Sequence, residues 1–208
     1  MTDTAVYPIP DHFSEAHVTP ERYHTLYRQS LDDPDTFWSE QAQLLDWHSP
    51  WSAVSETDVA KGAARWFVDA KLNVSVNCID RHLPERAHDT AIIWEGDDPD
   101  DSQSFTYQEL KIQVCRFANA LRAQGIGKGD RVCIYMPMIP EAVVAMLGCA
   151  RLGAVHSVVF GGFAAAELAK RIDDATPKAI ISASCGHEPN RIVSYKPLLD
   201  EAIELSTH

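Results

Sequence analysis

Residues 130–163 constrain the fold more strongly than any other stretch of the chain. They contain three apolar runs, at residues 131–136, 142–152 and 154–160. The first and third runs are short and rich in β-forming residues. The second is long enough for a helix, and Pro140 stands just before it, where the missing N–H of a first helical turn costs little. The stretch therefore predicts a strand, a helix and a second strand, which together form a βαβ unit.

The apolar character of these runs predicts deep burial. The helix has no polar face, and the strands are apolar on both sides, which is typical of a parallel sheet covered by helices on both faces. Gly153 is expected to end the helix in the left-handed conformation. His156 lies within the third run, so we expect it to be a hydrogen-bonded core residue.

The remaining patterns extend this unit in both directions. Thr106 and Glu109 form a capping box before a helical pattern of apolar residues. Further elements are predicted as strands near residues 90–95 and 178–182 and as helices near residues 19–31, 36–45, 76–83, 165–172 and 198–203. The fold class is therefore α/β, an incomplete doubly wound and mainly parallel sheet. We expect a helical or irregular extension over residues 1–85 and the first part of a large, truncated α/β domain over residues 86–208.

Composition limits the partners of this chain. The net charge of -12 argues against nucleic acid, because neutralising phosphates requires clusters of Lys and Arg. The five cysteines are widely spaced, so we expect reduced thiols and no metal site. No apolar run reaches membrane-spanning length, and the N-terminus lacks the pattern of a signal peptide. We therefore expect a cytoplasmic protein that binds small molecules; the sequence leaves its oligomeric state open.

Two segments follow the carboxyl ends of predicted strands, where open parallel sheets bind ligands. Phe160, Gly161 and Gly162 stand at the end of the strand at 154–160; glycines there allow close approach of a phosphate or a flat group, but the local pattern alone favours a tight turn into the next helix. Residues 184–191 form a predicted polar loop in which Arg191 is suited to hold a phosphate. A solvent-exposed arginine is the alternative interpretation.

Several familiar catalytic patterns are absent from the sequence. It contains no phosphate-binding loop of the G-x-x-x-x-G-K-[ST] type and no G-x-S-x-G nucleophile turn. The acidic residues 97–101 are interpreted as a hairpin tip, because they lack the glycine and glutamate spacing of a calcium loop. No residue is therefore predicted to be catalytic or to bind a metal.

Long runs of the chain resemble AMP-forming acetyl-CoA and propionyl-CoA synthetases, the acid–CoA ligases that form acyl-adenylates. Residues 37–38 (FW) and 45–47 (LDW) match the family's N-terminal extension. The other matching runs are residues 72–83 (LNVSVNCIDRHL), 93–96 (IWEG), 106–110 (TYQEL), 114–119 (VCRFAN), 135–142 (YMPMIPEA) and 149–163 (CARLGAVHSVVFGGF). The resemblance covers about residues 20 to 208, and its runs contain many rare residues.

The resemblance implies a reaction in which a short carboxylic acid and ATP with Mg²⁺ give an acyl-adenylate and pyrophosphate, and coenzyme A then displaces AMP. It implies that Phe160, Gly161 and Gly162 lie beside the coenzyme A nucleotide. It also implies two phosphate-binding arginines after the next strand, of which only Arg191 has a match here. Glu188 stands where relatives specific for acetate often have the other arginine, so the choice between acetate and propionate stays open.

The resemblance also implies that this chain is only the N-terminal portion of such an enzyme. The family's phosphate loop, acid pocket, adenine site and C-terminal domain follow later in sequence, so we expect these residues to catalyse neither half-reaction alone. This interpretation further predicts a sheet edge or face that is left uncovered. The alternative is an α/β module that binds a nucleotide or a partner without catalysis.

Overall fold

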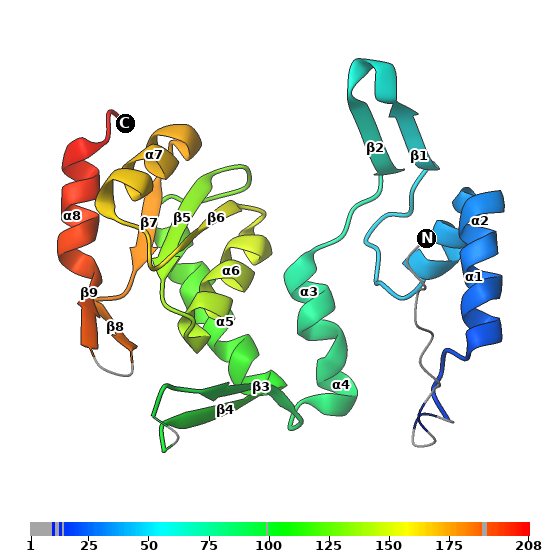
Figure 1. Ribbon diagram of the computed structural model, residues 1–208, viewed down its shortest axis with the longest axis horizontal. Helices are drawn as coiled ribbons and strands as arrows, with labels where there is room; N and C mark the ends of the chain where they lie inside the picture. Colours follow the sequence, from blue (N-terminus) through cyan, green and yellow to red (C-terminus); the bar gives the residue numbers. More distant parts are fainter. Residues whose placement is uncertain (1–9, 11–12, 14, 99, 189–190) are drawn as a thin grey trace, which may run out of the picture. The chain divides into compact units, whose positions relative to one another are not determined.

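The computed structural model describes residues 10, 13, 15–98, 100–188 and 191–208 and divides the chain into two compact units, residues 1–71 and 72–208 (Figure 1). We refer to them as unit 1 and unit 2. The domain boundary predicted at residue 85 stays a prediction. The boundary between the two compact units of the structure lies after residue 71.

Unit 1 begins with two helices, α1 (Pro20–Asp32) and α2 (Pro34–Ala42). Thr19 caps α1, and its side-chain oxygen accepts a hydrogen bond from the backbone N–H of Arg22. Asp33 separates the helices and caps α2 by accepting from the backbone N–H of Thr36. Both predicted helices are confirmed, and both start with proline at their first position.

An antiparallel hairpin completes unit 1. Strands β1 (Ala53–Asp58) and β2 (Ala63–Val68) are joined by the short helix η2 (Val59–Lys61). Three aromatic rings pack at its base: Trp47, Trp51 and Phe67 have centroids 5.2–5.3 Å apart. The aromatic residues of this region therefore pack against one another. The sequence does not predict the hairpin, because only Val54 and Val68 in its two strands are buried.

Unit 2 is built on a parallel sheet of three strands, β5 (Arg131–Met136), β6 (Val155–Phe160) and β7 (Ala179–Ser182), in the order β6-β5-β7. Cys133 of the central strand pairs with Ser157 on one side and with Ile180 on the other. The strands predicted near residues 131–136, 154–160 and 178–182 are therefore confirmed, and so is their parallel arrangement.

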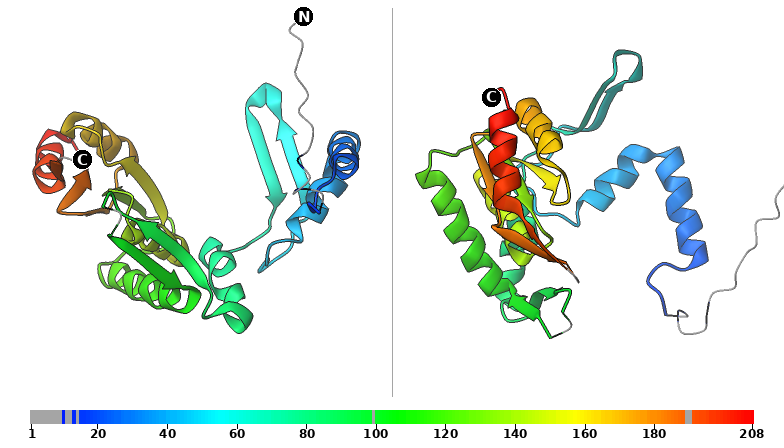
Figure 2. Two further views of the ribbon diagram at one scale, coloured as in Figure 1. Left: turned by 60° about the horizontal axis from the view of Figure 1, so that its bottom comes forward. Right: turned by 60° about the vertical axis from the view of Figure 1, so that its left-hand side comes forward.

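Helices cover both faces of this sheet (Figures 1 and 2). Alternate side chains of a strand point to opposite faces. Val132 and Ile134 pack with α5 (Tyr107–Ala123) and α6 (Pro140–Leu152), whereas Cys133 and Tyr135 pack with α7 (Ala165–Ala175) and α8 (Tyr195–Leu205). All four β5 side chains are at most 1% exposed. This arrangement confirms the α/β fold class.

Helix ends in unit 2 follow the predicted capping rules. The Thr106 hydroxyl accepts from the backbone N–H of Glu109 at 3.2 Å, and the Glu109 carboxylate accepts from the backbone N–H of Thr106 at 2.8 Å. The backbone N–H and the hydroxyl of Thr106, which both donate to the Glu109 carboxylate, lower the pKa of Glu109. Gly153 ends α6 with φ of +72°, in the left-handed region that favours glycine. The capping box and the glycine cap are both confirmed.

Strand β6 is much less buried than its sequence suggests. Val155 and Val158 are each 54% exposed, Phe160 is 67% exposed and His156 is exposed as well. The predictions of a β6 buried on both faces and of a core His156 are therefore wrong. The reason is that β6 lies at the edge of the sheet: β5 pairs with one side of it only, and the helices cover Val159 on one face but leave Val158 on the other face half exposed. The uncovered edge predicted from the family resemblance is present in the described residues.

The helix predicted at residues 76–83 is divided into three short pieces, α3 (Val74–Cys78), η3 (Asp80–His82) and α4 (Leu83–Arg86). Asp80 fixes this segment to the helices of the sheet through ion pairs with Lys111 of α5 and Arg151 of α6. The Asn73 side chain adds a 2.9 Å hydrogen bond to the carbonyl of Ala150.

The strand predicted near residues 90–95 is confirmed as β3 (Thr90–Glu95), but it lies outside the parallel sheet. It forms an antiparallel hairpin with β4 (Ser102–Thr106), and the acidic residues 97–101 stand at its tip, as predicted, with residue 99 outside the described residues.

No helix in the described part of the chain has the length and apolarity needed to cross a membrane. None of the five cysteines, all of which lie in the described residues, is in a disulfide bond, and Cys133 and Cys149 are buried.

Candidate functional site

The strand order places a topological switch point at the carboxyl end of the sheet. From the central strand β5 the chain passes to β6 on one side and then returns to β7 on the other. Loops that leave β5 and β7 therefore run in opposite directions and open a crevice between them. Ligands of open parallel sheets bind in such a crevice.

A cleft of about 610 Å³ occupies this position. Residues after β5 line one side of it, residues after β7 line the other, and the β3–β4 hairpin forms its rim. The lining residues are Trp94, Glu95, Gly96, Asp97, Asp98, Asp101, Pro137, Met138, Ile139, Cys185, Gly186 and His187. The indole N–H of Trp94 donates a 2.8 Å hydrogen bond to the carbonyl of Met138 and so ties the hairpin to the loop after β5.

The turn after β6 contains the predicted residues Phe160, Gly161 and Gly162. It is tight, because the backbone N–H of Phe163 donates to the carbonyl of Phe160 at 3.0 Å. The Phe160 ring lies over Gly162, where a Cβ would stand 2.5 Å from its Cε1 atom. The structure thus confirms the tight turn, and it also leaves the Phe160 ring 67% exposed and available for stacking on a flat ligand.

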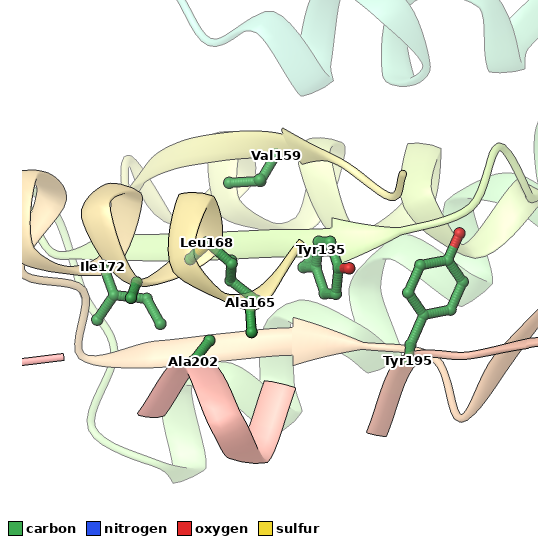
Figure 3. Packing of buried hydrophobic residues seen from close by; sticks show 9 residues of the cluster. Tyr135, Val159, Ala165, Leu168, Ile172, Tyr195 and Ala202 are labelled. Atoms are coloured by element: carbon green, nitrogen blue, oxygen red, sulfur yellow. The ribbon is translucent and has the colours of Figure 1, made fainter. Parts of the chain in front are cut away.

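Tyr195, the first residue of α8, joins this turn to the segment after β7. A Cβ on Gly161 would stand 2.6 Å from the Tyr195 hydroxyl, and a Cβ on Gly186 would stand 2.7 Å from Cε2 of the same ring. The ring is 6% exposed and meets Tyr135 edge to face at a centroid distance of 5.1 Å. Figure 3 shows the two rings side by side at one end of the core cluster.

The hydroxyl groups of this tyrosine pair have different surroundings. The Tyr135 hydroxyl donates a 2.8 Å hydrogen bond to the carbonyl of Phe163, which holds the turn after β6 against the central strand. Burial raises the pKa of both tyrosines, and the carboxylate of Glu188 raises that of Tyr195 further. Both side chains are therefore neutral hydrogen-bonding groups near pH 7.

Arg191 stands on a hairpin and not in the polar loop predicted for residues 184–191. Strands β8 (Cys185–Glu188) and β9 (Arg191–Ser194) pair antiparallel across residues 189–190, which lie outside the described residues. The Arg191 guanidinium donates to the Glu188 carboxylate at 2.6 Å, and this contact raises the pKa of Arg191. The prediction of a loop is wrong because residues 185–188 and 191–194 form backbone hydrogen bonds with each other. Their polar side chains give no sign of this pairing in the sequence.

The structure therefore brings together only some of the residues predicted for the site. The turn at Phe160–Gly162 and the segment at Gly186 meet on the ring of Tyr195, whereas Arg191 is engaged across its own hairpin by Glu188. Tyr195 itself is absent from the residues predicted for the site. Its only sequence signal is an aromatic residue at the start of a helix, which does not distinguish it from an ordinary core residue.

The charge of the cleft is predominantly acidic. Carboxylates at Glu95, Asp97, Asp98 and Asp101 line it, and His187 is the basic side chain among the lining residues. Within the described residues no group of three or more His, Cys, Asp or Glu side chains is placed to hold a metal ion. The carboxyl edge of the sheet thus offers the exposed ring of Phe160 and an acidic cleft with little positive charge.

Comparison with known families gives two adjoining matches. A family model described as "AMP-binding enzyme" matches residues 79–206, which is more than half of the chain. A second, described as "Acetyl-coenzyme A synthetase N-terminus", matches residues 23–78.

Individual relatives agree with these matches. Acetyl-coenzyme A synthetase of Alkalilimnicola ehrlichii is 54% identical over 206 residues, acetyl-coenzyme A synthetase 2 of Pseudomonas putida is 55% identical over 204, and acetyl-coenzyme A synthetase of Saccharophagus degradans is 54% identical over 205. Each match covers 98% of this chain and 32% of the relative, so the chain spans about a third of the length of the curated relatives it matches.

The two matched regions together contain the βαβ unit, the glycine turn at its end and the segment of residues 72–86 before the first hairpin of unit 2. The chain therefore belongs to the family of AMP-binding enzymes, and its first part matches the N-terminal region characteristic of acetyl-coenzyme A synthetases.

Proposed function

We propose that this chain forms the N-terminal portion of an AMP-forming short-chain acyl-CoA synthetase and contributes part of its coenzyme A site. Such an enzyme converts acetate or propionate, ATP and coenzyme A into acyl-CoA, AMP and pyrophosphate, with Mg²⁺ bound to the ATP. The reaction class is supported by the acetyl-coenzyme A synthetases that are 54–55% identical over nearly the whole chain.

The observation that carries the proposal for this part of the site is the turn at Phe160–Gly162. It stands at the carboxyl edge of the parallel sheet, and its Phe160 ring is 67% exposed where it lies over Gly162. The exposed ring suits stacking on a nucleotide base, and the turn suits a neighbouring phosphate group. Arg191 suits a phosphate less well, because Glu188 already neutralises it.

The residues of this chain would bind and orient, and they would not carry out the chemistry. ATP, when bound with Mg²⁺, would supply the adenylyl group for adenylation, with pyrophosphate as the leaving group. The sequence of residues 1–208 contains no glycine-rich phosphate loop that could hold the reacting phosphates. We therefore propose that these residues alone do not catalyse acid-dependent exchange of pyrophosphate into ATP, and measurable exchange by purified residues 1–208 would contradict this.

A hybrid enzyme tests the reaction class directly. Residues 1–208 would replace the matching third of the Alkalilimnicola synthetase, to which they are 54% identical. We expect the hybrid to form AMP when acetate, ATP and coenzyme A are all present. The same relative without its N-terminal third serves as the control and should be inactive. A hybrid that folds but forms no AMP would refute the proposal.

Binding of coenzyme A to residues 1–208 tests the site itself. We expect saturable binding by isothermal titration calorimetry, and loss of it in Gly161→Val, because a branched side chain there would collide with Tyr195 and with the carbonyl of Met136. The alternative of a binding module without chemistry predicts the same binding but an inactive hybrid. The two experiments together therefore separate the two functions.

A further inference from the structure

A thiol and an imidazole lie together on one wall of the cleft at the topological switch point. Cys185 and His187 are two positions apart in strand β8, so their side chains point to the same face of that strand. The Cys185 sulfur lies 4.0 Å from the His187 Nε2 atom, and both residues line the cleft of about 610 Å³. An unprotonated imidazole at this position can accept the thiol proton and leave a thiolate, the nucleophilic form of cysteine.

The hairpin holds this pair in place and leaves it within reach of the cleft. In the β8–β9 pairing Cys185 lies opposite Ser194, and His187 lies opposite Ile192. Cys185 is half-buried, and His187 is exposed. The Ser184 hydroxyl, also 4.0 Å from the Cys185 sulfur, is placed to donate to it. Both neighbours of the sulfur therefore favour its ionised form.

The other four cysteines have different surroundings. Cys133 and Cys149 are buried, and burial raises the pKa of each to about 11, so these thiols are protonated and out of reach near pH 7. Cys78 is exposed and Cys115 is half-buried. Among the residues that the structure describes, an imidazole contacts the sulfur of Cys185 and of no other cysteine.

The charge of the cleft selects which reagents reach this thiol. Four carboxylates line the same cleft, those of Glu95, Asp97, Asp98 and Asp101. A cleft lined by one sign of charge raises the local concentration of the opposite ion and lowers that of the same ion. A reagent that carries ammonium groups is therefore favoured over one that carries carboxylates.

We propose that Cys185 is a modification site, at which small disulfides bearing ammonium groups form a mixed disulfide with the protein. The His187 imidazole takes the Cys185 proton, the thiolate sulfur attacks one sulfur of the reagent, and the S–S bond of the reagent breaks. The departing thiolate then takes the proton from His187, so one thiol is released for each mixed disulfide formed. The inference does not depend on the proposed function, because the reagent itself is the oxidant and coenzyme A takes no part.

The experiment measures the rate of mixed disulfide formation at each cysteine of residues 1–208 by peptide mass spectrometry. The reagents are cystamine, 2-hydroxyethyl disulfide and dithiodipropionate, which are cationic, neutral and anionic. Cys78 is the internal control, because it is exposed and lies in a groove lined mostly by apolar side chains.

With the neutral reagent near pH 7.5, Cys185 should react about tenfold faster than Cys78, because its thiolate is favoured. The preference for cystamine over dithiodipropionate should also be about tenfold larger at Cys185 than at Cys78, and high salt should reduce it.

His187→Asn tests the role of the imidazole. It should slow the reaction of Cys185 about tenfold near pH 7.5 and leave that of Cys78 unchanged. At about pH 10 hydroxide removes the thiol proton without the imidazole, so the rates of the variant and of the unmodified chain should converge. His156→Asn, the same change at an exposed histidine of β6, is the matched control and should leave the rate at Cys185 unchanged.

Three results would each overturn the inference. The first is an equal rate at Cys185 and Cys78 with the neutral reagent, and the second is an unchanged rate at Cys185 in His187→Asn. The third is an equal charge preference at the two cysteines, which would show that the carboxylates of the cleft do not select the reagent.

Discussion

The ring of Tyr195 occupies the space into which a side chain at Gly186 would project. A Cβ on Gly186 would stand 2.7 Å from Cε2, 3.0 Å from the hydroxyl oxygen and 3.3 Å from Cζ, so the three nearest atoms all belong to Tyr195. Gly186 is not among the glycines with positive φ. Glycine is therefore required here by the close approach of one ring and not by backbone conformation.

We expect Gly186→Ala to lower the free energy of unfolding by about 1–3 kcal/mol, the usual cost of overpacking a core. In a Tyr195→Leu background the same change should cost almost nothing, because the obstructing ring is gone. Urea unfolding of the four chains in this double-mutant cycle measures the coupling.

Gly161→Ala serves as the comparison for this cycle. Its Cβ would meet the Tyr195 hydroxyl at 2.6 Å but also the backbone carbonyl of Met136 at 3.0 Å. Since that carbonyl stays in place, part of the cost should persist in the Tyr195→Leu background. Equal costs of Gly186→Ala in both backgrounds would contradict the assignment of the contact to Tyr195.

The exposed face of β6 gives a second prediction from two neighbouring valines. Val158 is 54% exposed, whereas Val159 is 3% exposed and packs in the core beneath α7. Val158→Lys should change the free energy of unfolding by less than about 0.5 kcal/mol, and Val159→Lys should unfold the chain or cost more than about 3 kcal/mol. Thermal unfolding of both variants checks this, and equal losses would mean that β6 is covered on both faces.

The sequence predicts the βαβ unit well because each of its signals is local. Apolar run length, Pro140 at the start of α6 and Gly153 at its end act within a few residues of one another, and the structure follows them closely. The capping box at Thr106 and Glu109 is equally local. Such signals fix the helices and the parallel strands before any distant contact is known.

What the sequence does not reveal depends on contacts between distant segments. An edge strand and a central strand can have the same apolar composition, so the exposure of Val158 and Phe160 follows only from the strand order. The role of Tyr195 depends on Gly161, which lies 34 positions earlier, and no periodic pattern links the two. The pairing of Arg191 with Glu188 depends in turn on a hairpin built from polar residues.

The ion pairs of Asp80 give a third prediction, which concerns the segment before the first hairpin. Asp80 contacts Lys111 and Arg151, and the three side chains are only 25%, 23% and 19% exposed. Burial and the nearby charge of Arg151 lower the pKa of Lys111, so that cation depends on Asp80 for compensation. Asp80→Asn should cost about 2 kcal/mol of unfolding free energy, less than for a fully buried pair.

Asp89→Asn is the control for this prediction, because Asp89 pairs with Arg86 at the surface and is 54% exposed. Its cost should stay below about 1 kcal/mol. Both values come from urea denaturation at the same salt concentration. If the two variants lose equal stability, the Asp80 network does not hold α3, η3 and α4 to the helices of the sheet.

The buried thiols predict how stability changes at alkaline pH. Burial raises the pKa of Cys133 and of Cys149 from 9.0 to about 11. Because the unfolded chain releases these protons first, their contribution to stability is complete below pH 9 and is lost as the pH rises towards 11. The double variant Cys133→Ala, Cys149→Ala should therefore lose less free energy of unfolding between pH 8 and pH 11 than the unmodified chain, as measured by urea unfolding at each pH.

Cys78→Ala, which removes an exposed thiol, should follow the unmodified chain. Identical pH profiles for the double variant and the unmodified chain would show that these two thiols ionise as easily in the folded state as in the unfolded state.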